Sequence, residues 1–189
     1  MSSRDEWKQH YDSSDDHADD DPFPKMLDGE AHNILGPYVA TETTTVVKAL
    51  RFAGVGPQDC IIDLGSGDGR FCVAAVQQFR ARAAVGIEID AELVRASQAH
   101  ATACGVGSKA RFTCADLTDP LLDVLTLAGD ANPFTLAIVF LLPESEPLFE
   151  RHVRRLYDGG VRILSLAFAL TGLQLLKSER PLYLYGRDG

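Results

Sequence analysis

The sequence predicts an α/β fold: a doubly wound, mostly parallel seven-stranded sheet with helices on both faces and a C-terminal antiparallel hairpin. From about residue 43, short apolar runs alternate with segments of helical periodicity. Near-continuous apolar strands separated by helices are typical of a parallel sheet buried on both faces. The last two apolar runs flank Arg180-Pro181 with no room for a helix between them, which indicates a hairpin.

The first half of this domain supplies most of the parallel strands. Val46, Val47 and Leu50 share one face of a helix that starts near residue 43 and ends at Gly54. Strands and helices then alternate to the middle of the chain. The expected elements are a strand at 59–65, a helix at about 69–80, a strand at 83–89, a helix at 91–104, a strand at 110–116, a short helix at 120–129 and the longest apolar strand at 134–142.

The second half completes the sheet. Ser145 is expected to cap the next helix, with Pro147 in its first turn. Two glycines near residue 160 end that helix, and a fifth parallel strand and the two hairpin strands follow. The buried face of the helix is expected to consist of Phe149, Val153 and Leu156. The three strands are expected at residues 161–170, 173–179 and 182–187.

Most of the net charge of -9 lies at the start of the chain. Residues 1–30 hold ten acidic and three basic side chains, whereas the remaining residues hold 17 acidic and 15 basic ones. We expect residues 1–30 to form an acidic, disordered arm and residues 31–189 to form the domain. Trp7, Tyr11 and Phe23 are the aromatic residues through which the arm would fold over a ligand or a basic partner. The near-neutral body shows no strong nucleic-acid signal.

The four cysteines predict neither a metal site nor disulfide bonds. They have no CxxC spacing and no paired histidines, so no metal is expected. Their apolar neighbourhoods are typical of buried thiols in a reducing compartment, and a cytoplasmic location is expected. No apolar run approaches the length that a transmembrane helix needs. The oligomeric state is left open.

The stretch "IIDLGSGDGR" at residues 61–70 is the first candidate for a binding site. A phosphate-binding P-loop needs a lysine after its last glycine, and this stretch has Arg70 there. A dinucleotide fingerprint needs G-x-G-x-x-G, and here the third glycine comes one residue early. Asp63 and Asp68 would also repel a pyrophosphate at the helix N-terminus. The loop therefore favours a ligand that is cationic or donates hydrogen bonds.

The pattern D-x-G-x-G-x-G after a first strand resembles the motif of the class I, seven-strand, Rossmann-like S-adenosylmethionine-dependent methyltransferases. The resemblance implies S-adenosyl-L-methionine as the cofactor and S-adenosyl-L-homocysteine as the product. This cofactor carries an ammonium and a sulfonium but no phosphate, and these charges suit an acidic loop. The residues that this motif places around the cofactor are Asp63, Gly65, Ser66, Gly67, Asp68 and Gly69.

Two further acidic positions follow the family's order along the chain. "GIEID" ends the second strand, and Glu88 matches the carboxylate that takes both ribose hydroxyls, with Asp90 as the second choice. A carboxylate presents two acceptors in one plane, as a vicinal diol requires. "CADL" follows the third strand, and there Asp116 would accept from the adenine amine. Each acid could instead be an ordinary loop carboxylate or helix cap. Ile89 and Leu117 directly follow Glu88 and Asp116, and we expect them to contact the cofactor as well.

The segment "PYVATETTTVVKAL" resembles a narrower group, the compact protein-lysine methyltransferases. That group includes bacterial members and protein-lysine methyltransferases that act on the c subunits of ATP synthase and on adenine nucleotide carriers. The resemblance implies that Tyr38 and Thr41 lie over the methionine end of the cofactor. It also implies that the substrate enters beside "FLLPE", which gives the substrate-facing candidates Tyr38, Phe140, Leu141, Pro143 and Glu144. No residue is assigned as a catalytic acid or base.

These observations predict an enzyme that transfers a methyl group to a protein lysine amine. The (N/D/S)PP(Y/F) motif of enzymes that methylate nucleobase amines is absent after the fourth strand, where "FLLPE" stands. A protein substrate is therefore the expected partner. Two alternatives stay open: a methyltransferase for a small molecule, and a module that binds the cofactor for a partner protein without doing chemistry.

Overall fold

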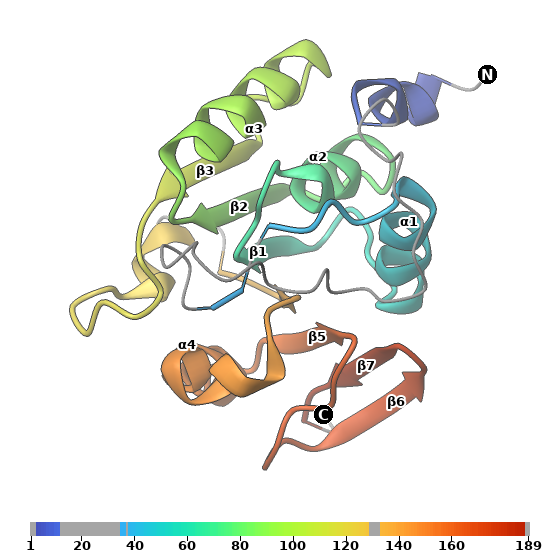
Figure 1. Ribbon diagram of the computed structural model, residues 1–189. Helices are drawn as coiled ribbons and strands as arrows, with labels where there is room; N and C mark the ends of the chain where they lie inside the picture. Colours follow the sequence, from blue (N-terminus) through green and yellow to red (C-terminus); the bar gives the residue numbers. More distant parts are fainter. Residues whose placement is uncertain (1–2, 12–34, 37, 129–132, 188–189) are drawn as a thin grey trace.

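The computed structural model describes residues 3–11, 35–36, 38–128 and 133–187 (Figure 1). A seven-stranded sheet in the order β3-β2-β1-β4-β5-β7-β6 runs through the molecule. The pairings β3-β2, β2-β1, β1-β4 and β4-β5 are parallel, and β7 runs antiparallel to both β5 and β6. The strands are β1 Cys60–Leu64, β2 Ala83–Glu88, β3 Ala110–Cys114, β4 Leu136–Val139, β5 Arg162–Leu166, β6 Leu175–Glu179 and β7 Leu182–Tyr185. The predicted fold class is confirmed.

Helices cover both faces of this sheet. Successive side chains of a strand point to opposite faces, so Ile61 joins the apolar cluster that contains Leu50 and Val73, whereas Ile62 joins the cluster that contains Phe149. The first cluster packs under α1 and α2, and the second packs under α4. The helices are η1 Ser3–His10, α1 Thr43–Phe52, α2 Arg70–Gln77, α3 Ala91–Ala103, η3 Val124–Ala128, η4 Pro143–Ser145 and α4 Glu146–Asp158.

The strand order reverses between β1 and β4, and this fixes where a ligand can bind. The chain leaves β1 toward β2 and β3 on one side, and it later adds β4 and β5 on the other side. In open α/β sheets the connections diverge at such a point and leave a crevice at the carboxyl ends of the strands. The glycine-rich stretch of residues 65–69 follows β1 directly at that crevice.

Two predictions about β4 and α4 were wrong in detail. The strand expected at 134–142 has only four residues, because Phe140 and Leu141 leave the ladder and line a cavity at the strand end. Ser145 occupies the N-cap position of α4 but makes no side-chain cap bond. Its hydroxyl instead lies 2.7 Å from the Leu142 carbonyl and 3.1 Å from the Leu35 carbonyl, which share its one proton, and so joins the segment before α1 to the start of α4.

The first described segment is folded against the domain, which differs from the expected disordered arm. Trp7 and Tyr11 are 0% and 1% exposed and belong to the cluster under α1 and α2. The indole Nε1 of Trp7 donates to Gln78 Oε1 at 3.0 Å. Two buried aromatic rings remove enough apolar surface from water to order a short 3-10 helix. Phe23 and the rest of the predicted arm lie outside the described residues.

No helix within the described ranges is both long and apolar enough to cross a bilayer.

Candidate functional site

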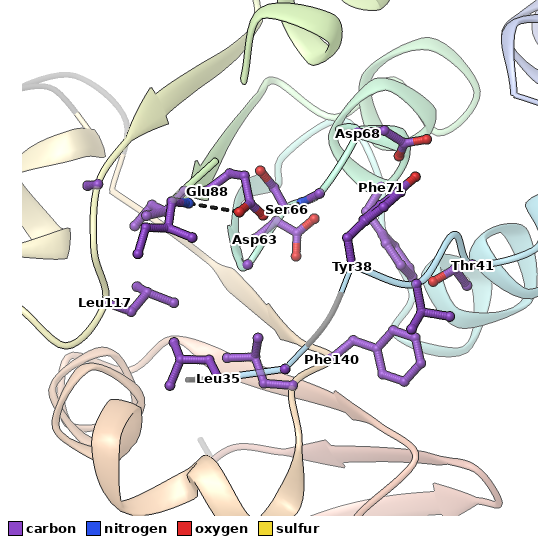
Figure 2. Close-up of a pocket in the computed structure, with 18 of the residues that line it drawn as sticks. Leu35, Tyr38, Thr41, Asp63, Ser66, Asp68, Phe71, Glu88, Leu117 and Phe140 are labelled. Atoms are coloured by element: carbon purple, nitrogen blue, oxygen red, sulfur yellow. Dashed lines mark hydrogen bonds between the residues drawn. The ribbon is translucent and has the colours of Figure 1, made fainter. Parts of the chain in front are cut away.

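A cavity of about 280 Å³ lies at the carboxyl ends of β1, β2, β3 and β4 (Figure 2). It contains nearly all of the residues that the sequence singled out as cofactor-binding. These are Tyr38, Thr41, Asp63, Gly65, Ser66, Gly67, Asp68, Glu88, Ile89, Asp116 and Leu117, together with the substrate-facing candidates Phe140 and Leu141. Gly69 does not line the cavity, and neither do Pro143 and Glu144, which are exposed at the start of η4. The sequence reasoning missed the lining residues Leu35, Gly36, Val39, Arg70, Phe71, Ile87, Ala115 and Thr118.

The glycine loop is shaped by positive φ angles and close packing. Gly67 has φ of 53°, and a Cβ there would lie 2.6 Å from the Tyr38 ring. Gly69 has φ of 82°, and a Cβ there would lie 2.6 Å from Phe112 and 2.8 Å from Ser97. Only glycine adopts such angles without strain. Gly67 therefore keeps the cavity wall close to Tyr38, whereas Gly69 serves the packing of the loop against β3 and α3.

Glu88 ends β2 and is held by backbone amides on both of its oxygens. Its Oε2 accepts from the Gly67 amide at 2.8 Å, and its Oε1 accepts from the amides of Ile89 at 2.8 Å and Asp90 at 3.0 Å. The side chain is 6% exposed and lines the cavity. These bonds fix the carboxylate at the edge of the sheet, beside the glycine loop.

The other two acids near β2 and β3 have structural partners of their own. Asp90, the second choice for the ribose carboxylate, is the N-cap of α3: its Oδ1 accepts from the amides of Glu92 and Leu93, and it does not line the cavity. Asp116 lines the cavity, and its Oδ1 accepts from the amide and the hydroxyl of Thr118, both at 2.7 Å. These two bonds fix the Asp116 carboxylate within the loop after β3, where both residues line the cavity.

Asp63 gives the cavity its electrostatic character. The side chain lies at the end of β1 and is 3% exposed. Burial raises the pKa of its carboxyl well above the ordinary value, and the nearby carboxylates of Glu88 and Asp68 raise it further. A bound cation would offset both effects. The site therefore favours a ligand that carries positive charge close to Asp63.

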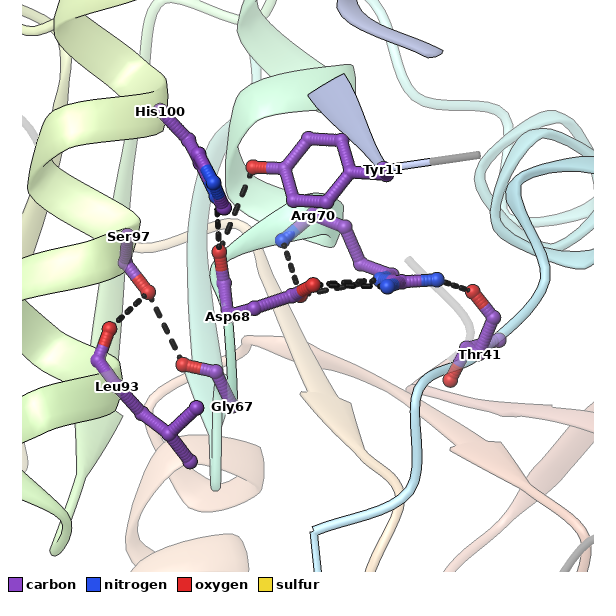
Figure 3. A network of polar contacts seen from close by, with 8 residues as sticks. All are labelled: Tyr11, Thr41, Gly67, Asp68, Arg70, Leu93, Ser97 and His100. Carbon is purple, nitrogen blue, oxygen red and sulfur yellow. Dashed lines mark hydrogen bonds and ion pairs between the residues drawn. The ribbon is translucent and has the colours of Figure 1, made fainter. Parts of the chain in front are cut away.

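Asp68 is the acid whose partner the sequence did not reveal. Arg70 Nη2 lies 2.8 Å from Asp68 Oδ2, Arg70 Nε lies 3.0 Å from Oδ1, and both side chains are nearly fully buried (Figure 3). Arg70 is the one basic side chain among the described residues that line the cavity. Because its charge is matched by Asp68, it does not make the cavity attractive to phosphate.

Aromatic side chains line the end of the cavity opposite Glu88 and Leu117. Figure 2 shows Asp63 near the middle, with Tyr38, Thr41, Phe71 and Phe140 on the far side. Tyr38 is 42% exposed at the rim. Burial of part of its ring raises the pKa of the Tyr38 hydroxyl, which keeps the phenol protonated. Three aromatic rings therefore lie at one end of the cavity, beside the paired side chains of Asp68 and Arg70, and the Glu88 carboxylate lies at the other end.

The sheet order, the glycine loop and the acid at the end of each of the first three strands define a class I S-adenosylmethionine-dependent methyltransferase. Residues 63–177 match the family model of the ANTKMT methyltransferase domain, and the chain belongs to that family. The cofactor is S-adenosylmethionine, and the chemistry of the cavity fits it. The described lining residues offer carboxylates for an ammonium, a sulfonium and ribose hydroxyls, and their single basic side chain is already paired.

Relatives named as lysine methyltransferases are similar to most of this chain. A protein-lysine N-methyltransferase from Saccharolobus islandicus is 29% identical over 72% of this chain and 79% of its own length. The mouse lysine N-methyltransferase named for the C subunit of ATP synthase is 30% identical over 70% of this chain and 47% of its own length. The chain thus spans about half the length of the ATP synthase lysine methyltransferases that it matches.

Solved structures support the same fold. The crystal structure of an RNA methyltransferase from Salinibacter ruber in complex with S-adenosyl-L-homocysteine is 27% identical, with a TM-score of 0.63 over 78% of this chain and 91% of that one. The precorrin 8W decarboxylase of Methanobacterium thermoautotrophicum gives a TM-score of 0.59 over 80% and 93% of the two chains, at 15% identity. The second likeness concerns the fold alone.

Proposed function

We propose that this protein transfers a methyl group from S-adenosylmethionine to the side-chain amine of a protein lysine. The observation that carries the proposal is the division of the cavity into an end with the Glu88 carboxylate and an end with three aromatic rings. The three rings of Tyr38, Phe71 and Phe140 suit an aliphatic chain that ends in an amine. The names of the relatives at 29% and 30% identity support a lysine acceptor.

The proposed orientation of the cofactor follows from the geometry of the acids. Glu88 would accept from the ribose hydroxyls, and Asp116 would accept from the adenine amine. Asp63 would face the ammonium, because burial and two neighbouring carboxylates destabilise its ionised form and a nearby positive charge would stabilise it. The remaining contacts proposed for the cofactor are those of Tyr38, Thr41, Gly65, Ser66, Gly67, Ile89 and Leu117.

S-adenosylmethionine supplies the electrophilic methyl group, and the amine lone pair attacks it in line with the bond to sulfur. The chain has to align the amine, exclude water and keep the amine neutral. Phe71 and Phe140 are buried or partly buried, so they remove water from the path of the lysine. A desolvated amine beside a sulfonium loses its proton more readily. Alignment of two bound reactants contributes about 7–11 kcal/mol to such reactions.

The test is a radiolabelled methyl transfer assay with a cell lysate from which protein, RNA and metabolite fractions are separated. Label in lysine residues of the protein fraction, located by mass spectrometry, is the expected result. Label in metabolites would indicate a small-molecule enzyme. Binding of S-adenosylhomocysteine without transfer to any fraction would indicate a module that serves a partner protein.

RNA is the second candidate acceptor, because a structural relative at 27% identity is named an RNA methyltransferase. The charge of the chain opposes this candidate, since the net charge is -9 and phosphate backbones are bound mainly by lysine and arginine. Label in the RNA fraction that disappears after ribonuclease treatment would favour RNA over lysine.

We also propose a reducing compartment, such as the cytoplasm, as the place of action. The four cysteines of the described segments are free: Cys60 and Cys72 are buried, Cys104 is half-buried and Cys114 is exposed. Free thiols are typical of proteins from reducing compartments. Fractionation of cells that express a tagged chain tests this proposal, and a secreted product would contradict it.

A further inference from the structure

An ion pair beside the cavity joins three segments that are far apart in the sequence. Arg70, the first residue of α2, holds Asp68 of the glycine loop through Nε and Nη2. Its Nη1 donates to the carbonyl of Thr41, in the segment before α1. The guanidinium also lies 5.1 Å from the centre of the Tyr11 ring, which directly follows the N-terminal helix η1. Figure 3 shows Arg70 between Asp68, Thr41 and Tyr11.

Tyr11 covers this ion pair from outside the cavity. It is 1% exposed, and its hydroxyl lies 3.4 Å from the carbonyl of Asp68, to which it donates. His100 of α3 packs edge-on against the same ring at 4.8 Å, and Trp7 does so at 5.8 Å. Burial raises the pKa of the Tyr11 phenol, which keeps the hydroxyl a donor. Removal of the ring would admit water to a buried ion pair.

Two of the segments that Arg70 joins, the glycine loop and the segment of Thr41, form one wall of the cavity. Asp68 and Thr41 lie on the same side of it as Tyr38 and Phe71, away from Glu88 and Leu117 (Figure 2). In the proposed orientation the nucleoside occupies the Glu88 side, and the methionine moiety extends toward Asp63 and Thr41. A displaced glycine loop or Thr41 segment would therefore disturb the methionine moiety more than the nucleoside.

We propose that Arg70 and Tyr11 are positioning residues for the methionine end of the cofactor. The N-terminal helix η1, which Tyr11 follows, would thereby contribute to cofactor binding. This inference rests on the proposed cofactor orientation. Neither residue is assigned a contact with the reacting atoms. Arg70 fixes the glycine loop against the Thr41 segment, and Tyr11 excludes water from the ion pair of Arg70 and Asp68. An ion pair that is exposed to water loses most of its energetic value.

The test compares two ligands that differ only in the part at issue. S-adenosylhomocysteine carries the amino acid moiety, and 5′-methylthioadenosine has the nucleoside and the sulfur without it. Calorimetry with Tyr11→Ala in the full chain should show an S-adenosylhomocysteine Kd raised about tenfold, in line with the loss of a buried charge-assisted contact. The Kd of 5′-methylthioadenosine should change less than about twofold. Tyr11→Phe keeps the ring and should restore most of the affinity.

Tyr157→Ala is the matched control. Its ring carries Arg187 at 5.1 Å, the same distance as that between Tyr11 and Arg70, but Arg187 is exposed and, unlike Arg70, does not line the cavity. Its loss should leave both Kd values unchanged. Tyr11→Leu, which keeps the site apolar, replaces Tyr11→Ala if the latter does not fold, and should show the same selective loss.

Equal increases in both Kd values, or no increase in either, would overturn the positioning role. Failure of the unaltered chain to bind S-adenosylhomocysteine would instead overturn the proposed function. A chain that binds it but methylates no lysine would leave the positioning role standing and remove only the proposed acceptor.

Discussion

The Gly67 amide donates to Glu88 Oε2 at 2.8 Å, and this bond joins the glycine loop to the end of the neighbouring strand. The same carboxylate accepts from the amides of Ile89 and Asp90 through Oε1. A carboxylate offers about four lone-pair positions, and three are occupied here. Glu88 therefore shapes the loop and is also the proposed ribose ligand. Its one remaining lone-pair position is on Oε2, so a ribose hydroxyl bound there would share that oxygen with the Gly67 amide.

Glu88→Gln should weaken S-adenosylhomocysteine binding by about 10- to 100-fold, or about 1.5–3 kcal/mol, which is the range of a hydrogen bond to a charged group. The amide keeps one acceptor oxygen but turns an NH₂ group toward backbone amides, so the melting temperature should also fall. Calorimetry and thermal unfolding measure the two effects. Glu92→Gln is the control, since Glu92 is exposed in the first turn of α3. An unchanged affinity in Glu88→Gln would contradict the ribose assignment.

Asp63→Asn should have opposite effects on folding and on binding. Burial and the carboxylates of Glu88 and Asp68 raise the pKa of Asp63 in the folded state, so its ionised form destabilises the ligand-free protein. The amide removes this charge and should raise the melting temperature at neutral pH. It also removes the counter-charge of the cofactor's ammonium, so S-adenosylhomocysteine affinity should fall at least tenfold, about 1.4 kcal/mol.

The pH dependence of the Asp63→Asn effect follows from the sign of the shift. Between the unfolded pKa of about 3.9 and the raised folded pKa of Asp63, the folded state binds more protons than the unfolded state. The free energy of unfolding therefore decreases as pH rises through this window. The stability advantage of Asp63→Asn should vanish below about pH 4 and reach its full size above the folded pKa. Urea titrations at several pH values test it, and an advantage independent of pH would be the contrary result.

Gly67→Ala should impair cofactor binding beyond its effect on stability. Its φ is positive and the new methyl group would lie 2.6 Å from the Tyr38 ring, so both the loop and Tyr38 have to move. Gly105→Ala is the matched control, because Gly105 has φ of 70° with no atom within 4 Å of an added Cβ. Both variants should lose about 1–2 kcal/mol of stability from backbone strain. Only Gly67→Ala should also raise the Kd of S-adenosylhomocysteine; equal Kd values would show that close packing against Tyr38 is unimportant.

The predicted fold was accurate wherever the signal was local. Alternating apolar runs and helical periodicity depend on neighbours in the sequence, and they placed all seven strands in order. The end of β4 was misplaced because apolar residues continue past the sheet into the cavity wall at Phe140 and Leu141. The packing of η1 was missed because Trp7 and Tyr11 lie in a polar segment without periodicity. Their burial depends on a surface formed by α2, which the sequence does not display.

The site was predictable to the extent that topology determines it. Parallel strands bring their carboxyl ends to one edge, so acids that follow successive strands meet there. The pairing of Asp68 with Arg70 was not predictable, since it depends on how two side chains turn at the start of α2. A partial signal existed: an arginine that follows an acidic loop and opens an apolar helix has to find a carboxylate once it is buried.

His152 of α4 should make stability fall at mildly acidic pH. Its Nε2 lies 2.8 Å from the Leu117 carbonyl, which only accepts, and 3.1 Å from Nη2 of Arg151, which only donates. In the tautomer with its proton on Nε2, His152 donates to Leu117 and holds the loop that lines the cavity. Burial is the main effect and lowers the pKa of His152, and the charges of Arg151 and Arg155 lower the pKa further. The bond to Leu117 and the charge of Asp123 act in the opposite direction, but the net shift is downward. With a folded pKa below the unfolded value of about 6.5, the unfolded state binds more protons below that pH, so the free energy of unfolding decreases there.

Two substitutions separate the charge of His152 from its hydrogen bond. His152→Gln keeps a donor near the Nε2 position and does not titrate, so the decline in stability below about pH 6.5 should become shallower, with cofactor affinity retained. His152→Leu removes the shorter of two side-chain hydrogen bonds to the Leu117 carbonyl, the other being that of Arg151 Nη2 at 3.4 Å, and should lose about 0.5–1.5 kcal/mol at neutral pH. It should also weaken S-adenosylhomocysteine binding, because Leu117 lines the nucleoside side of the cavity. Urea titration from about pH 5 to 8 measures both, and parallel pH profiles for His152→Gln and the unaltered chain would show that another group titrates.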